Sequence, residues 1–308
     1  MALYITGHKI PDSDSICSAI AVAYLKNSLG VEAIACKQGE MNVESRYILD
    51  RFGLDEPITK TSYKDEDTFI TDTTDLALCP DDILDARVVG VVDHHKLGDL
   101  TTSTPLEAWI RPVGSSNTIV KQMYDFYGVE IPSNIAAIMM CAILSDTVIF
   151  KSPTCTKEDT KAVKELAKIA GIDDPKEIGM ELFKIKSQIE GSSERDLIMR
   201  DFKEFNMSGT HLGIGQLESV DLSVFDDKKD ALLEDMARLK DEKDLHSVLL
   251  LLTDIINEGS QLLAVSDDLD KIQKAFNVSI DPKNGVWLDK VLSRKKQIVP
   301  PLEDIFRG

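Results

Sequence analysis

The sequence is poor in cysteine, in aromatic residues and in long apolar runs, and each shortage excludes a class of protein. Its five cysteines are an odd number with no CxxC pair, so we expect neither a disulfide framework nor a thiolate zinc site. No apolar run reaches the roughly 18 residues that a membrane helix needs. The N-terminus has no basic region of the kind that begins a signal peptide. We therefore expect a cytoplasmic protein with reduced thiols and no membrane partner.

Basic residues are also scarce. The 35 Lys and Arg against 53 Asp and Glu give a net charge of −18, and only 6% of the residues are aromatic. A nucleic-acid partner needs a broad basic face, and single strands need aromatic stacking platforms, so we expect no nucleic-acid partner. An anionic substrate would have to be held by metal ions and a few focused cations, because the overall field would repel it.

A chain of 308 residues is longer than most single-core domains, so we expect two domains. The first half alternates apolar strands with segments of helical spacing, beginning with a strand at 3–7 and a helix at Ser13–Ser28. Arg87–Asp93 is a continuous run rich in β-branched residues, typical of a strand covered on both faces. We therefore predict an α/β fold whose N-terminal domain, residues 1–187, contains a parallel sheet.

The pattern changes after a short polar segment at 188–193, which we predict to be a linker. Two stretches, 203–207 and 211–220, flank a Ser-Gly pair and predict a β-hairpin. A charged helix over 222–243 and two further strands follow. These features predict a smaller C-terminal domain over residues 194–308, with a mixed sheet and helices.

Carboxylate and imidazole side chains recur where predicted strands of the first half end, or within one of its helices. They are His8, Asp12, Asp14, Asp72, His94 and Asp146. Because the carboxyl ends of parallel strands share one edge of the sheet, we expect these side chains to converge. Asp146 lies in an apolar helical segment, where a carboxylate is costly unless it is paired or bound to a metal. Asp12 could alternatively serve only as a helix N-cap, and the isolated His211 and His246 are expected in a core.

A charge count favours two metal ions. Four buried aspartates in one pocket would repel each other, and two divalent cations would bring their charge to zero. Two such ions about 3.5–4 Å apart can activate water and hold phosphoryl oxygens, with Asp72 as the best-placed bridge. Mixed carboxylate and imidazole ligation favours manganese or cobalt over magnesium, and zinc also remains open.

Basic residues appear late in the chain, in two places. Lys203 follows Asp201-Phe202, and Ser293-Arg294-Lys295-Lys296 lies near the C-terminus. Arginine gives bidentate contacts to phosphate and lysine a point charge, so both fit an anion site. A solvated basic run is the alternative interpretation of the second motif.

These residues carry a resemblance to a known family. Asp93-His94-His95 is the motif that names the DHH phosphoesterase superfamily. The wider set resembles the family II, manganese-dependent inorganic pyrophosphatases over nearly the whole chain, and the C-terminal basic motif separates that family from other DHH enzymes. The motifs that carry the resemblance are His8-x3-Asp12-x-Asp14, Asp72, Asp93-His94-His95, Ser145-Asp146, Ile149 to Thr156 and Ser293-Arg294-Lys295-Lys296-Gln297.

The resemblance implies a role for each site residue. One manganese ion would be held by His8, Asp12 and Asp72. The second would be held by Asp14, Asp72, His94 and Asp146, with cobalt as a possible substitute. The pyrophosphate oxygens would be bound by His95, Lys203, Arg294 and Lys295, and His95 could also supply a proton to the leaving phosphate.

The resemblance further implies hydrolysis of pyrophosphate to two orthophosphates by a water or hydroxide that bridges the metals. The substrate would arrive as a magnesium complex, since magnesium commonly binds through phosphate oxygens. The active site would form between the two domains, and the protein would be a homodimer through its N-terminal domain.

The chain departs from the family pattern directly after Asp72. Where the family usually reads Asp-His-Asn-Glu, this sequence reads Asp72-Thr73-Thr74-Asp75. Residues beside metal ligands typically change affinity or activity by about 10–100-fold, so metal preference and turnover are open. The segment 114–118 could present amides to substrate or simply cap a helix, and Lys296 has no assigned contact.

Two other functions compete with this interpretation. Another DHH phosphoesterase could act on short polyphosphate or small oligonucleotides, although the few aromatics and the acidic charge disfavour the latter. A nucleotide- or metal-sensing protein without catalysis is the second, but no segment resembles an appended regulatory domain.

Overall fold

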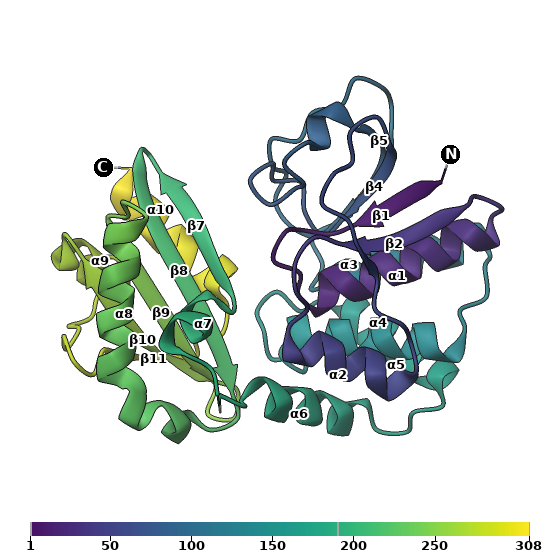
Figure 1. Cartoon of the computed structure of the whole chain (residues 1–308). Helices are drawn as coiled ribbons and strands as arrows, with labels where there is room; N and C mark the ends of the chain where they lie inside the picture. Colours follow the sequence, from purple (N-terminus) through teal and green to yellow (C-terminus); the bar gives the residue numbers. More distant parts are fainter. Residues whose placement is uncertain (1, 190, 308) are drawn as a thin grey trace. The chain divides into compact units, whose positions relative to one another are not determined.

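The computed structural model describes residues 2–189 and 191–307, which form two compact units divided between Leu182 and Phe183 (Figure 1). Each unit has its own sheet. The segment 188–193, predicted as a linker, follows this division, and its Glu190 lies outside the described residues. No helix in the described ranges combines the length and the apolar character needed to cross a membrane.

The first unit is built on a six-stranded, all-parallel sheet in the order β3-β2-β1-β4-β5-β6, which confirms the predicted parallel sheet. Its strands are β1 (Leu3–Thr6), β2 (Ala33–Lys37), β3 (Ile58–Thr59), β4 (Asp67–Thr71), β5 (Arg87–Asp93) and β6 (Glu107–Ile110). The chain leaves β1 toward β2 and later returns to the other side of β1 as β4. Ligands of parallel sheets bind beyond the carboxyl ends of the strands where the order reverses, here between β1 and β4.

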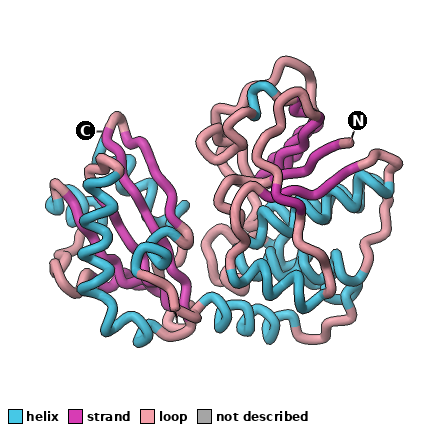
Figure 2. Tube along the Cα trace, viewed as in Figure 1, coloured by secondary structure: helices cyan, strands magenta, loops and turns pink. Residues whose placement is uncertain are grey.

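Helices cover one face of this sheet in two layers (Figure 2). They are α1 (Ser13–Ser28), α2 (Val43–Phe52), α3 (Ser116–Tyr127), α4 (Ser133–Asp146) and α5 (Lys157–Ala170). Helix α6 (Pro175–Lys186) contains the division and leads into the second unit. Helices α1 and α3 contact the strands, and α4 packs against both of them from outside. Cys17 and Cys141 are fully buried in these layers, as their apolar surroundings indicate.

Loops cover the opposite face. Ile70, Val88 and Val91 pack there against Cys79 and Ile83, which lie in the connection between β4 and β5. Strand β5 is therefore buried on both sides, as its β-branched run predicts, although only one side is covered by helices.

The second unit contains a five-stranded mixed sheet in the order β11-β10-β9-β8-β7, in which β8 and β9 alone are parallel neighbours. Its strands are β7 (Phe202–Met207), β8 (Thr210–Ser219), β9 (Ser247–Asp254), β10 (Gly259–Ser266) and β11 (Val286–Asp289). Its helices are α7 (Glu194–Met199), α8 (Lys229–Glu242), α9 (Leu269–Phe276) and α10 (Val299–Phe306). The hairpin and the mixed sheet are confirmed.

Strand β9 shows how this sheet is held. Val248, Leu250 and Leu252 face the cluster that contains α7 and α8, while Leu249 and Leu251 face α9 and α10. Alternate side chains of a strand point to opposite faces, so one apolar run serves two cores.

Two predictions for this unit need correction. The charged helix expected over 222–243 is divided into 3-10 turns at Leu222–Lys228 and helix α8. His211 is exposed at the hairpin end of β8 rather than buried, and His246 is half-buried with its Nδ1 2.7 Å from Ser247 Oγ. Both histidines lie near strand ends, where the sheet no longer covers them.

The pairing of β4 with β5 requires a glycine. Phe69 lies directly opposite Gly90, and a Cβ atom at Gly90 would overlap the Phe69 ring. We expect Gly90→Ala to lower the free energy of unfolding by about 1–3 kcal/mol, the usual cost of overpacking. Urea unfolding measures it. The double variant Gly90→Ala with Phe69→Leu should lose less stability than the two single variants lose together. A loss equal to the sum of the two single losses would contradict the overlap.

Candidate metal centre

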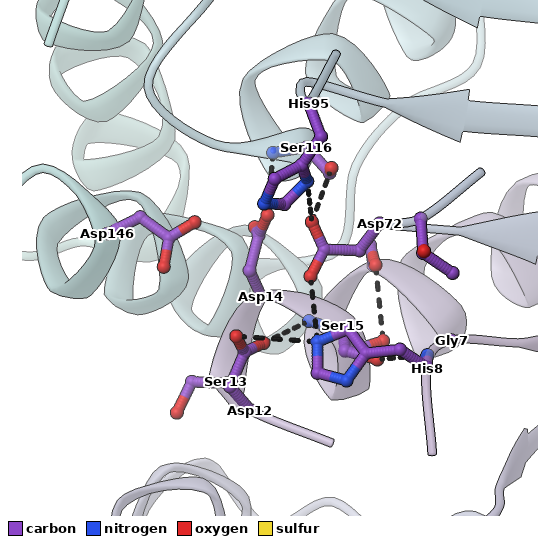
Figure 3. A network of polar contacts seen from close by, with 12 residues as sticks. Gly7, His8, Asp12, Ser13, Asp14, Ser15, Asp72, His95, Ser116 and Asp146 are labelled. Atoms are coloured by element: carbon purple, nitrogen blue, oxygen red, sulfur yellow. Dashed lines mark hydrogen bonds and ion pairs between the residues drawn. The ribbon is translucent and has the colours of Figure 1, made fainter. Parts of the chain in front are cut away.

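His8 and Asp12 lie directly beyond the carboxyl end of β1 (Figure 3). The His8 Nε2 atom is 3.5 Å from Asp12 Oδ2 and 3.4 Å from Asp72 Oδ2. Asp12 Oδ1 accepts a hydrogen bond from the Ser15 amide at 2.9 Å, so Asp12 also caps α1. Asp12 can therefore cap the helix and belong to the site at the same time, because each function uses a different carboxylate oxygen.

Asp72 stands at the centre of the site. It follows β4 in a left-handed conformation with φ of 64° and is only 2% exposed. Its Oδ2 faces His8, while Oδ1 accepts a hydrogen bond from Ser116 Oγ at 2.9 Å and lies 3.5 Å from His94 Nε2. The two oxygens thus face two different sets of partners, as a bridging ligand requires.

Asp14 is completely buried and is held by the N-terminus of α3. Its carboxylate accepts hydrogen bonds from the Ser116 amide at 2.7 Å, the Asn117 amide at 3.1 Å, Asn117 Nδ2 at 2.8 Å and the Ser115 hydroxyl. The free amides and positive end of a helix N-terminus favour such an anion. Ser115 also caps α3, so the cap interpretation of this segment holds, and its amides serve Asp14.

His94 and Asp146 complete the cluster. His94 Nε2 is 4.0 Å from Asp14 Oδ2 and 3.8 Å from Asp146 Oδ2, and His94 Nδ1 is 3.0 Å from the Val113 carbonyl. Asp146 is the last residue of α4, so its carboxylate emerges at the helix end rather than from the apolar interior. The chain then turns through positive φ angles at Val148, Ile149 and Phe150. Such strain clusters at functional sites.

The donor atoms suit divalent metals. Three groups could each hold an ion, with ligand atoms within 4.8 Å of one another: His8, Asp12 and Asp72; Asp14, His94 and Asp146; and Asp72, His94 and His95. Mixed carboxylate and imidazole donors of this kind fit manganese or cobalt. The convergence predicted from the sequence is confirmed for these side chains.

The charges of the metal-free site are mutually unfavourable. Burial, followed by the charges of Asp14 and Asp12, raises the pKa of Asp72 well above its usual value. Burial and the same neighbouring carboxylates raise the pKa of Asp146 in the same direction. Burial lowers the pKa of His8, but Asp12 and Asp72 outweigh it and raise that pKa to about 10. A metal ion must therefore displace protons from this cluster.

Sequence reasoning gave no role to two buried carboxylates. Asp93 Oδ1 accepts a hydrogen bond from the His95 amide and lies 2.9 Å from His95 Nδ1. Glu44, on α2, accepts hydrogen bonds from Ser13 Oγ at 2.7 Å and Ser145 Oγ at 3.1 Å. Asp93 could have been found, since a buried acid beside a histidine at a strand end usually orients it. No local pattern marks Glu44.

The predicted basic residues belong to the second unit, where Arg294 is an ordered, buried side chain. Its guanidinium donates to the Asp201 carbonyl at 2.6 Å, the Ile214 carbonyl at 2.9 Å and Asp201 Oδ1 at 2.7 Å. Lys203 pairs with Ile214 in the β7–β8 ladder, so both bases reach the same part of the sheet. Lys295 is exposed. A merely solvated basic run is therefore wrong for Arg294.

Metal binding should depend on pH. Asp72, Asp146 and His8 have raised pKa values in the metal-free protein, so they hold protons that a metal must release. The affinity for manganese should therefore increase from pH 6 to pH 8, by roughly tenfold per pH unit for each proton released. Titration calorimetry in two buffers of different ionisation enthalpy measures both quantities.

Asp72→Asn should weaken manganese binding by more than about 100-fold, since even outer partners of metal ligands contribute about 10–100-fold. The exposed Asp173→Asn is the matched control and should bind like the unmodified protein. For the unmodified protein, an affinity for manganese that is equal at pH 6 and pH 8 would contradict the prediction that metal binding releases protons.

Comparison with known proteins places this site in a family. The model of the DHH family N-terminal domain matches residues 2–143, and that of the DHHA2 domain matches residues 180–305. A manganese-dependent inorganic pyrophosphatase of Methanothrix thermoacetophila is 41% identical, over 99% of this chain and 98% of its own. One of Methanocaldococcus jannaschii is 39% identical, over 99% of both chains.

A solved structure agrees with these relatives. The crystal structure of a Methanococcus jannaschii protein described as a family II inorganic pyrophosphatase matches with a TM-score of 0.89 and 37% identity. The match covers 99% of this chain and 100% of the other. With its sheets, its aspartate and histidine cluster and these matches in agreement, the chain belongs to the family II, manganese-dependent inorganic pyrophosphatases.

Proposed function

We propose that this protein hydrolyses inorganic pyrophosphate to two orthophosphates and depends on manganese for this reaction. The observation that carries the proposal is the buried cluster around Asp72, which offers carboxylate oxygens in two directions. Relatives that match almost the full chain are named for this activity. Buried like charges with raised pKa values are typical of metal or catalytic sites.

We propose that two manganese ions bind per subunit, in positions that share Asp72. His8 and Asp12 would complete the first position, and Asp14, His94 and Asp146 the second. Bound manganese supplies Lewis acidity, which lowers the pKa of water and offsets phosphate charge. The protein contributes rigidity, because Ser116 and the α3 amides hold the carboxylates in place. Cobalt has similar ligand preferences and should substitute.

His95 is proposed to contact pyrophosphate and to supply a proton to the leaving phosphate. Its Nδ1 faces Asp93 Oδ1 at 2.9 Å, which indicates that Nδ1 carries a hydrogen and assigns the tautomer. To supply a proton, the ring would carry a second hydrogen on Nε2, which is the atom proposed to face the leaving phosphate. The His95 side chain is also the most exposed of the imidazoles in this cluster, at 29%.

Lys203, Arg294 and Lys295 are proposed to bind the pyrophosphate oxygens, with magnesium accompanying the substrate. Three bonds to Asp201 and Ile214 fix the plane of the Arg294 guanidinium. They use three of its five N–H hydrogens, so two remain for a phosphate. A few ordered cations of this kind are needed, because the chain as a whole carries a charge of −18.

A homodimer through the N-terminal domain and a cytoplasmic location remain proposals. The dimer rests on the resemblance to the family. The location rests on the cysteines, all five of which are free, as expected where thiols are kept reduced.

The substrate can be identified by phosphate release. The metal-free protein, reloaded with manganese or cobalt, should release phosphate from magnesium pyrophosphate much faster than from tripolyphosphate or a dinucleotide, and more slowly with zinc or magnesium alone. Asp72→Asn should abolish release, and Asp173→Asn should retain it. Preference for the longer substrates would assign the protein to another DHH activity, and no release with any metal would contradict catalysis.

Arg294→Lys tests the anion site. Lysine keeps the charge but cannot reproduce the fixed fork, so contacts of about 1.5–3 kcal/mol each should be lost. We expect kcat/KM for pyrophosphate to fall by at least about tenfold, while manganese affinity stays constant. Arg307→Lys, at the exposed end of α10, is the matched control. Equal kinetics of the two variants would exclude Arg294 from substrate binding.

A further inference from the structure

The pair Thr73-Thr74 stands where the family pattern has His-Asn, and the two threonines make different contacts. Both are nearly buried, at 3% and 5% exposure. Thr73 Oγ1 accepts a hydrogen bond from the Asp75 amide at 3.2 Å, which is a local turn contact. Thr74 Oγ1 reaches across to the next strand and donates to Asp93 Oδ2 at 3.1 Å.

The direction of this bond is determined by a second contact. The Gly98 amide donates to Thr74 Oγ1 at 2.9 Å, and an amide N–H can only donate. The hydroxyl therefore accepts from Gly98 and directs its own hydrogen to Asp93. A hydroxyl held at both ends cannot rotate freely, so it presents one fixed donor to the carboxylate.

Asp93 connects the Thr74 hydroxyl to His95 through its two carboxylate oxygens. Asp93 is completely buried, and while Oδ2 accepts from Thr74, Oδ1 accepts from the His95 amide and lies 2.9 Å from His95 Nδ1. Fixing one oxygen of a carboxylate fixes the plane of both. Buried polar chains of this kind stabilise one arrangement when every member is satisfied.

The loop after the histidines is fitted closely to Thr74. The Leu100 amide donates to the Thr74 carbonyl at 3.1 Å, and the Leu76 amide donates to Asp99 Oδ1 at 2.9 Å. A Cβ atom at Gly98 would overlap the Thr74 main chain, so only glycine permits this approach. The loop thus holds the Gly98 amide at the threonine hydroxyl.

We propose that Thr74 is a positioning residue for pyrophosphate hydrolysis: its hydroxyl fixes the Asp93 carboxylate, which in turn orients the His95 ring. The proposal rests on the proposed role of His95. Thr74 touches neither substrate nor metal in this scheme and acts through Asp93. Removal of such an outer partner typically lowers activity by about 10–100-fold.

The test compares Thr74→Val, which removes the hydroxyl at nearly constant shape, with Thr74→Ser, which retains it. The matched control is Thr68→Val, since Thr68 is fully buried on the same strand β4 and its hydroxyl donates to the Glu66 carbonyl at 3.4 Å. With manganese loaded, kcat for pyrophosphate should fall by about tenfold in Thr74→Val and recover in Thr74→Ser. Manganese affinity should not change in either.

A second measurement does not depend on activity. In the metal-free protein, histidine NMR should show a slowly exchanging Nδ1 hydrogen on His95, assigned by its loss in His95→Gln. It should exchange faster in Thr74→Val, and should be unchanged in Thr74→Ser and Thr68→Val. The proposal is overturned if Thr74→Val matches Thr68→Val in kcat and in exchange, or if Thr74→Ser is as impaired as Thr74→Val. An unmodified protein that does not hydrolyse pyrophosphate would instead refute the proposed function, and the NMR comparison would still test the contact.

Discussion

The mutual repulsion of buried carboxylates around Asp72 is the constraint on which the first unit depends. Burial and neighbouring negative charge raise the pKa of Asp72 and of Asp146, so the metal-free site resists full ionisation. A fold can retain such a cluster only if the surrounding structure holds it. The unit meets this condition by directing main-chain amides, hydroxyls and an imidazole at the acids.

The N-terminus of α3 provides much of this support through its amides and hydroxyls. The amides of Ser116 and Asn117 point at Asp14, and the Ser116 hydroxyl points at Asp72. One helix end therefore restrains two aspartates that come from different parts of the chain. The strand order also contributes, because its reversal between β1 and β4 places His8 beside Asp72.

The second unit meets an opposite requirement, the burial of a cation. Arg294 is only 8% exposed, and its guanidinium bonds with Asp201 and Ile214 replace the water that it loses. The sheet of this unit has apolar side chains on both faces, which cannot hydrogen-bond to a guanidinium. The partners of Arg294 are therefore a few polar groups placed close to it. The acids of the first unit and this arginine follow the same rule, since a buried charge needs partners whose positions do not vary.

The sequence by itself determined the classes of the longer elements and which aspartates and histidines converge around Asp72. Helix α1 has the predicted bounds because its apolar spacing, its cap and the following Gly30 agree, and β5 is marked by its β-branched run. The short strands β6 and β11 were not predicted, because most of their side chains are only partly buried and they lack the apolar pattern that marks β1. Only the tertiary structure decided the two-way role of Asp72, the capture of Asp14 by α3 and the link from Thr74 to His95. These depend on which oxygen faces which partner, and that is set by strand order and loop approach between segments that are distant along the chain.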